Sequence, residues 1–130
     1  MKIARALLDD IVEHARQDAP NECCGVVSAE GDDAREVFRL ENTAHSPLKF
    51  VVGADLVPVW EGIEDAGLRI GAIYHSHTRT APYPSQTDIN FAAQWPGVEW
   101  IIVGLDNGSV DVRSFVIDGG DVREVALEVE

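Results

Sequence analysis

An apolar, β-prone segment at residues 68–74 leads directly into the sequence His75-Ser76-His77. Its content of isoleucine, leucine and tyrosine predicts a buried strand. Successive side chains of a strand point to opposite faces of a sheet, so His75 and His77 project together while Ser76 turns away. The sequence therefore predicts two imidazoles side by side on a rigid, buried element.

A second polar group follows after seven residues, where Ser-Gln-Thr-Asp occupies residues 85–88. A serine followed three residues later by an acidic residue, just ahead of an apolar run, is typical of a helix N-cap with an acidic N3 position. Pro82 and Pro84 stiffen the connection to the strand. A helix that begins at Ser85 would hold Asp88 on its first turn, so the cap itself would position a carboxylate.

Two histidines and a nearby aspartate form a candidate donor set for a metal ion. A mononuclear catalytic zinc usually takes three protein ligands and keeps its fourth position for water, and Asp88 is the local candidate for the third ligand. By spacing alone an H-x-H pair is a weak signal, and Ser85 and Asp88 would serve equally well as a cap with no metal. The residues by themselves leave both interpretations open.

Composition excludes several classes of protein. The 130 residues, 45% hydrophobic and 25% charged, fit a single soluble domain over residues 1–130. The longest apolar runs fall far short of a membrane span, and two aspartates interrupt the N-terminal apolar stretch before a signal peptide develops, so we expect a cytoplasmic protein with no membrane partner. The net charge of −13 argues against a nucleic-acid partner and favours a protein or small-molecule substrate.

The cysteines and the remaining histidines offer no second site. Cys23 and Cys24 are adjacent and would face opposite ways on a strand, so we expect free, packed thiols in a reducing compartment. His14 and His45 lie outside any metal-binding spacing and are interpreted as surface or capping residues.

The pattern of the whole chain predicts an α/β fold, with a single mixed, largely antiparallel sheet flanked by two to three helices. Apolar spacing predicts helices at residues 7–18, 54–66 and 85–94. Strands are expected at residues 23–28, 34–40, 50–52, 68–74 with the histidines that follow, 99–105, 110–116 and 122–128. Hairpin-turn residues join several of them, at 31–33, 106–109 and 118–121.

These residues together resemble the JAMM (MPN+) zinc metalloprotease family. The family pattern is an upstream glutamate, then H-[ST]-H, seven residues and S-x-x-D. This chain has the required residue at every position of the pattern. Its upstream acid is Glu22, in a stretch at residues 21–27 that is similar to the family's E-x-C-G-hydrophobic strand. The resemblance covers most of the chain, since the predicted elements follow the family's order. It implies the JAMM/MPN fold, which is cytidine-deaminase-like.

The same resemblance implies the chemistry of the site. His75, His77 and Asp88 would ligate one Zn²⁺ per chain, and Glu22 would act as general base and then general acid for a metal-activated water. Ser85 would donate a hydrogen bond to the developing oxyanion. Taken without the family, Glu22 reads as an exposed acid ahead of a strand.

Compact prokaryotic members of the family are the most similar, because they share His-Ser-His-Thr and Tyr-Pro-Ser, found here at residues 75–78 and 83–85. Such relatives are isopeptidase-like or deubiquitinase-like hydrolases that cut after the C-terminal Gly-Gly of a ubiquitin-like or sulfur-carrier protein. The product is either cysteine, in cysteine biosynthesis, or an isopeptide-linked amine, and both outcomes stay open. A narrow groove would admit the Gly-Gly tail by strand addition. The oligomeric state also stays open, a homodimer included.

Three other interpretations compete with a peptidase. A catalytically inactive MPN-type interaction module is disfavoured because the chain has all five site residues, Glu22, His75, His77, Ser85 and Asp88. A RadC-like protein associated with DNA repair is disfavoured by the acidic charge. A zinc deaminase would need the H-x-E and P-C-x-x-C signature, which the sequence lacks.

Overall fold

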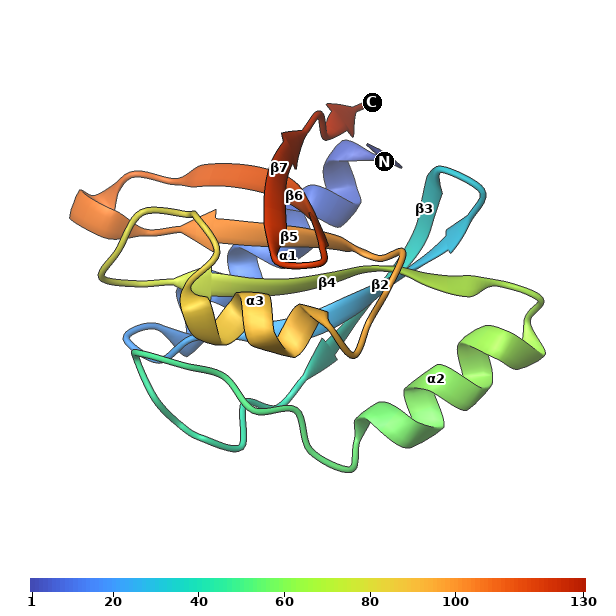
Figure 1. Cartoon of the computed structure of the whole chain (residues 1–130), viewed down its shortest axis with the longest axis horizontal. Helices are drawn as coiled ribbons and strands as arrows, with labels where there is room; N and C mark the ends of the chain where they lie inside the picture. The colour runs from blue at the N-terminus through green and yellow to red at the C-terminus, as the bar shows by residue number, and fades with distance from the viewer.

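A curled sheet of eight strands forms the centre of the molecule (Figure 1), in the order β7-β6-β5-β4-β2-β3-β1-β8. The computed structural model covers residues 1–130, except for the side chain of Asn107. The strands are β1 (Lys2–Ile3), β2 (Cys24–Glu30), β3 (Asp33–Leu40), β4 (Arg69–His77), β5 (Glu99–Gly104), β6 (Asp111–Asp118), β7 (Asp121–Val125) and β8 (Glu128–Val129).

The pairing confirms a mixed sheet. The hairpins β2–β3, β5–β6 and β6–β7 are antiparallel, as is β2–β4, whereas β4 and β5 run parallel at the centre. The short β1 pairs in parallel with both β3 and β8, so the two ends of the chain meet at one edge of the sheet. The central β4 is buried over all but its first residue, which is what the apolar segment before the histidines predicts.

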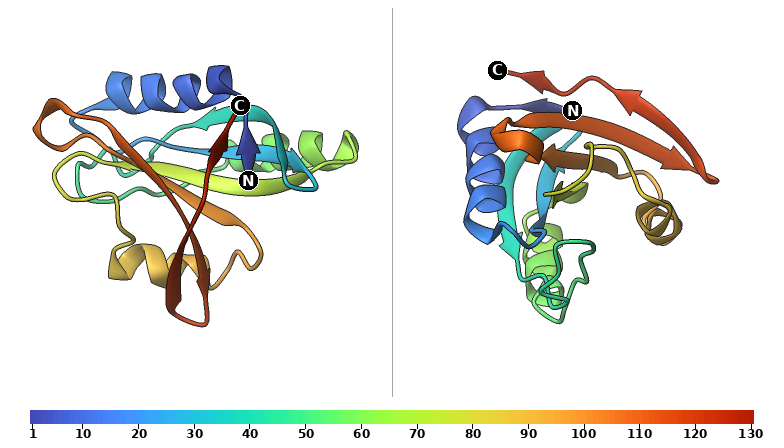
Figure 2. Two further views of the ribbon diagram at one scale, coloured as in Figure 1. Left: turned by 90° about the horizontal axis from the view of Figure 1, so that it is seen from above. Right: turned by 90° about the vertical axis from the view of Figure 1, so that its left-hand side faces the viewer.

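Three helices, α1 (Arg5–Asp18), α2 (Leu56–Asp65) and α3 (Gln86–Ala92), complete the described part of the chain, together with a short 3₁₀ turn. Figure 2 shows α1 on one side of the sheet and α3 on the other. The stripe Leu8, Ile11 and Ala15 of α1 packs into one core cluster, while Ile63 of α2 and Ala92 of α3 pack into the second. Among the described residues, no helix has the length and apolarity needed to cross a membrane.

Two predicted strands differ in the structure. Residues 50–52 form no strand beyond a single bridge between Val52 and Asn42, because the Asn42 side chain accepts the Val51 N–H that a neighbouring strand would otherwise take. The segment 122–128 divides into β7 and β8, which lie at opposite edges of the sheet. The N-terminal β1 was not predicted, since two residues carry no readable period.

Candidate metal centre and active site

Strand β4 places two imidazoles at its carboxyl end. His75 is fully buried, His77 is nearly so, and their Nε2 atoms lie 3.1 Å apart. The Nδ1 of His77 lies 2.9 Å from the Ala81 carbonyl oxygen, which can only accept, so this nitrogen carries the proton and donates it. The Nε2 lone pair of His77 is therefore free to bind a cation.

Helix α3 supplies a carboxylate to the same point. Its N-cap is Ser85, whose Oγ accepts from the Asp88 N–H (3.1 Å), while the Ser85 N–H donates to Asp88 Oδ2 (2.9 Å). This reciprocal capping box confirms the predicted cap and holds the carboxylate over β4. Asp88 Oδ2 lies 3.1 Å from His75 Nε2 and 3.2 Å from His77 Nε2.

The three donor atoms fit a small metal ion. A tetrahedral zinc with bonds of about 2.0–2.1 Å holds its ligand atoms roughly 3.3 Å apart, close to the triangle formed by the two Nε2 atoms and Oδ2. Burial lowers the pKa of His75 despite the neighbouring Asp88, which favours the neutral imidazole. Burial alone would raise the pKa of Asp88, but hydrogen bonds with the two histidines hold it well below its ordinary value. Both groups thus favour the forms that bind metals.

Glu22 lies next to this triangle, just ahead of β2. It is 4% exposed, and a carboxylate oxygen, the His75 ligand nitrogen and the His77 ligand nitrogen all lie within 4.8 Å of one another. Asp88 lies at hydrogen-bond distance from both imidazoles, and Glu22 is a second carboxylate beside them. Burial raises the pKa of Glu22 to about 7, with His77 opposing the shift and Asp88 adding to it.

Several contacts that the sequence does not reveal hold Glu22 in place. Its N–H donates to the Ser46 carbonyl (2.9 Å), and its own carbonyl accepts from Asn42 Nδ2 (2.9 Å). The next residue, Cys23, donates its N–H to Ser76 Oγ (2.8 Å). Ser76 faces away from the histidines as predicted, yet it is a specific hydrogen-bond acceptor and not merely a small residue.

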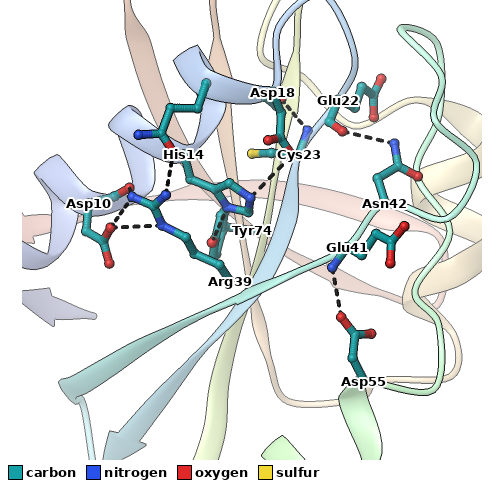
Figure 3. A network of polar contacts seen from close by, with 12 residues as sticks. Asp10, His14, Asp18, Glu22, Cys23, Arg39, Glu41, Asn42, Asp55 and Tyr74 are labelled. Atoms are coloured by element: carbon teal, nitrogen blue, oxygen red, sulfur yellow. Dashed lines mark hydrogen bonds and ion pairs between the residues drawn. The ribbon is translucent and has the colours of Figure 1, made fainter.

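The opposite face of β4 carries a different polar network (Figure 3). The Tyr74 hydroxyl lies 2.7 Å from His14 Nδ1, and His14 Nε2 lies 3.3 Å from the Asp18 carboxylate. His14 is 5% exposed, so its interpretation as a surface residue was wrong: an amphipathic helix gives no sign of which polar residue will find a buried partner 60 positions away. His45, by contrast, is exposed.

A glycine makes room for that network. Gly25 of β2 is the cross-strand partner of Tyr74, and a Cβ on Gly25 would lie 2.2 Å from the tyrosine ring. The tyrosine is fully buried beneath α1, in keeping with the buried strand that its segment predicts. The two adjacent cysteines are buried and free, and burial raises the pKa of each thiol to about 12, so both remain protonated and unreactive.

The fold and the site define a class of protein. Residues 4–118 match the family described as prokaryotic homologs of the JAB domain, and the chain belongs to that family. It is a hydrolase of the JAMM metalloprotease class, with a candidate metal site at the end of β4.

Curated relatives cover nearly the whole chain. A CysO-cysteine peptidase of Mycobacterium tuberculosis is 36% identical over 127 residues, which span 95% of this chain and 86% of the relative. A desampylase of Haloferax volcanii is 32% identical and covers 100% of this chain and 96% of its own length. A probable TtuB-protein conjugate cleaving protease of Thermus thermophilus is 34% identical, over 98% of this chain and 81% of the relative.

Solved structures agree with this family. A protein from Desulfitobacterium hafniense has a TM-score of 0.86 at 26% identity, covering 100% of this chain and 93% of its own. A JAB1/MPN domain protein from Archaeoglobus fulgidus has a TM-score of 0.69 at 27% identity, covering 99% and 98%. A structure described as having the metalloprotease-like zinc site JAMM has a TM-score of 0.62 at 26% identity, covering 100% and 97%.

Proposed function

We propose that the protein is a zinc-dependent peptidase or isopeptidase that cuts the amide bond after the C-terminal Gly-Gly of a ubiquitin-like or sulfur-carrier protein. The observation that carries the proposal is the triangle of His75 Nε2, His77 Nε2 and Asp88 Oδ2, with edges of 3.1 to 3.2 Å. These three atoms would hold the zinc. When bound, zinc supplies Lewis acidity, which activates a water molecule and polarises the scissile carbonyl.

Glu22 is proposed to move the proton. Its carboxylate stands beside the ligand triangle, and a pKa of about 7 allows one group both to accept and to donate a proton at neutral pH. It would take the proton from the attacking water and return it to the leaving amine. This role needs no direct bond to zinc.

Ser85 is proposed to stabilise the oxyanion. Its Oγ accepts the Asp88 N–H through a lone pair, and this leaves its own O–H available to donate to a developing negative charge. The capping interaction thus orients the hydroxyl. The Ser85 hydroxyl therefore caps the helix through an oxygen lone pair and would serve catalysis through its hydrogen.

The small space beside the site supports a glycine-ended substrate. A cavity of about 50 Å³ lies between a loop segment and α3, lined by Leu48, Lys49, Phe50, Ser85, Thr87, Asp88 and Phe91. Such a space accommodates an extended backbone better than a large side chain. The names of the relatives support the coarser proposal of a carrier-protein conjugate as substrate, because they describe a CysO-cysteine peptidase and a probable TtuB-protein conjugate cleaving protease.

The test is cleavage of a carrier protein that ends in Gly-Gly and is joined through its C-terminus either to cysteine or to a lysine side chain. Zinc-loaded protein should cut after the second glycine, and a carrier ending in Ala-Ala should resist. A chelator should abolish the reaction, and added zinc should restore it. Cleavage that persists in chelator, or that ignores the two glycines, would contradict the proposal.

The masses of the products identify the leaving group. A free carrier with released cysteine indicates the peptide-bond reaction, and a free carrier with an unmodified lysine indicates the isopeptide reaction. Comparing the two substrates at equal concentration gives the preference directly.

A further inference from the structure

The side-chain amide of Asn42, in the connection between β3 and α2, makes every hydrogen bond that it can make. It is 5% exposed. Its Nδ2 donates to the carbonyls of Glu22 (2.9 Å) and Lys49 (3.0 Å), and its Oδ1 accepts the N–H groups of Ala44 and Val51, both at 3.0 Å. An asparagine amide has two donor hydrogens and two acceptor lone pairs, so each of them has a partner in Asn42.

The donor half of this amide holds the backbone of the proposed general base (Figure 3). The Glu22 carbonyl accepts a hydrogen bond from the Asn42 side chain. The Glu22 N–H donates to the Ser46 carbonyl. Ser46 belongs to the same connecting segment that Asn42 folds. Both backbone polar groups of Glu22 are therefore bonded to this segment, so the segment fixes the position of the Glu22 Cα. The position of the Cα in turn sets how close the carboxylate comes to the ligand triangle.

Both halves of the amide fold the segment beside the proposed metal ligands, Nδ2 through Lys49 and Oδ1 through Val51. Between Lys49 and Val51, whose backbone groups bond Asn42, stands Phe50, whose ring stacks on His75 with centroids 4.6 Å apart and planes at 28°. Phe50 also meets Phe91 of α3 edge to face at 5.7 Å. The Asn42 side chain thus links the backbone of Glu22 to the segment that carries the aromatic cover of His75.

We propose that Asn42 is a positioning residue of the hydrolytic site, which keeps Glu22 at a fixed distance from the ligand triangle through the segment 42–51. The proposal rests on the role of Glu22 as proton carrier. Asn42 touches none of the three proposed zinc ligands directly, so it should govern turnover and leave metal binding unchanged. A displacement of a catalytic group by about 1 Å can cost on the order of 100-fold in rate.

Thr43 provides a matched control. Its Oγ1 donates to the Val51 carbonyl (3.0 Å), so it anchors the same segment at an adjacent position with no bond to Glu22. Thr43→Val removes this bond at nearly constant volume. A role limited to loop anchoring would make the Thr43 and Asn42 variants behave alike.

The experiment compares Asn42→Ala, Asn42→Asp and Thr43→Val in the full chain by kinetics, zinc affinity and amide hydrogen exchange. For Asn42→Ala we expect kcat to fall about 10- to 100-fold, with KM and the zinc Kd within about twofold of the parent. Without the Asn42 bond to its carbonyl, the Glu22 backbone should move away from Ser46, which accepts the Glu22 N–H. The Glu22 amide should therefore exchange at least about tenfold faster in both Asn42 variants and at the parental rate in Thr43→Val. Asn42→Asp keeps the acceptor half, so the Val51 amide should stay protected.

Equal effects of Thr43→Val and Asn42→Ala on kcat and on Glu22 exchange would overturn the proposal, as would parental Glu22 exchange in both Asn42 variants. If Asn42→Ala fails to fold, Asn42→Asp decides by the contrast between the Glu22 and Val51 amides. A parent protein that cuts no Gly-Gly conjugate would contradict the proposed function, and the exchange pattern would still decide whether Asn42 positions Glu22.

Discussion

The two faces of β4 handle polar groups in opposite ways. On the face toward α1, Tyr74 meets His14 and Ser76 accepts the Cys23 N–H, so these buried hydroxyls have protein partners. On the face toward α3, the two histidines turn their Nε2 atoms toward each other and toward one carboxylate oxygen. The buried Nδ1 of His75 has no hydrogen-bond partner among the described residues.

The polar groups on the α1 face of β4 therefore stabilise the fold, whereas those on the α3 face form the candidate metal site. Buried polar atoms that stabilise a fold are paired with each other, because an unpaired one costs about 1–3 kcal/mol. Three donor atoms that converge within 3.2 Å have instead the arrangement of a cation site. Alternation along a strand allows both arrangements to coexist, and each can be perturbed without the other.

The largest effect is expected on the α3 face, from Glu22→Gln. The amide keeps the size of the side chain and cannot take the proton of the attacking water, so kcat should fall on the order of 100- to 10,000-fold. Steady-state cleavage of a Gly-Gly conjugate measures it. Turnover at the parental rate would remove Glu22 from the mechanism.

Gly25→Ala should disrupt the opposite face. The new Cβ would overlap the Tyr74 ring at 2.2 Å, so the tyrosine must move out of a packed core, and we expect a loss of about 1–3 kcal/mol in the free energy of unfolding. Chemical denaturation measures this loss. The control is Gly62→Ala on the exposed side of α2, where a Cβ meets open space and should stabilise by roughly 0.5–1 kcal/mol. Equal stability of the two variants would refute the packing argument.

A smaller loss is expected from Tyr74→Phe, which keeps the ring and removes only the hydroxyl. His14 Nδ1 would then be buried without its partner, at a cost of about 1–2 kcal/mol. The zinc affinity should stay unchanged, since the hydroxyl lies on the far face of the strand. A variant that unfolds at the parental denaturant concentration would show that the pair contributes nothing.

The smallest effect is the pH dependence contributed by His14. Burial lowers its pKa below the ordinary 6.5, while Asp18 and Asp10 act to raise it and Arg39 to lower it further. The unfolded chain therefore binds this proton more readily, and the contribution of His14 to stability is complete above pH 6.5 and declines as the pH falls below that value. Unfolding of the parent and of His14→Gln between pH 5 and 8, in chelator, isolates the difference. A gap between them that is constant over this range would contradict the assignment.

Local pattern predicted much of this architecture. Alternation in β4, the Ser85 cap and the turn residues at 31–33 and 118–121 are short-range signals, and each corresponds to the observed element. The convergence of His75, His77 and Asp88 could be predicted because they lie within one strand, one loop and one helical turn. Glu22 required the family resemblance, since its contact with β4 arises only through the pairing of β2.

The parts that sequence did not predict are those held by side chains across long separations. Asn42 bonds a carbonyl 20 residues earlier, and His14 pairs with a tyrosine 60 residues later. Neither contact produces a periodic sequence pattern, and the predicted strand at 50–52 was wrong because the Val51 N–H bonds the Asn42 side chain in place of a neighbouring strand. Hydrophobic periodicity and secondary-structure propensity do not predict which distant residue a single polar side chain will contact.

The central proposal is that His75, His77 and Asp88, and not Glu22, would hold the metal ion. The most direct measurement is the zinc content of the purified chain and of two matched variants, Asp88→Asn and Glu22→Gln, by elemental analysis after equilibration with one equivalent of zinc and removal of the unbound metal. We predict about one zinc per chain in the parent and in Glu22→Gln, and strongly reduced zinc in Asp88→Asn. Retention by Asp88→Asn together with loss in Glu22→Gln would contradict the account.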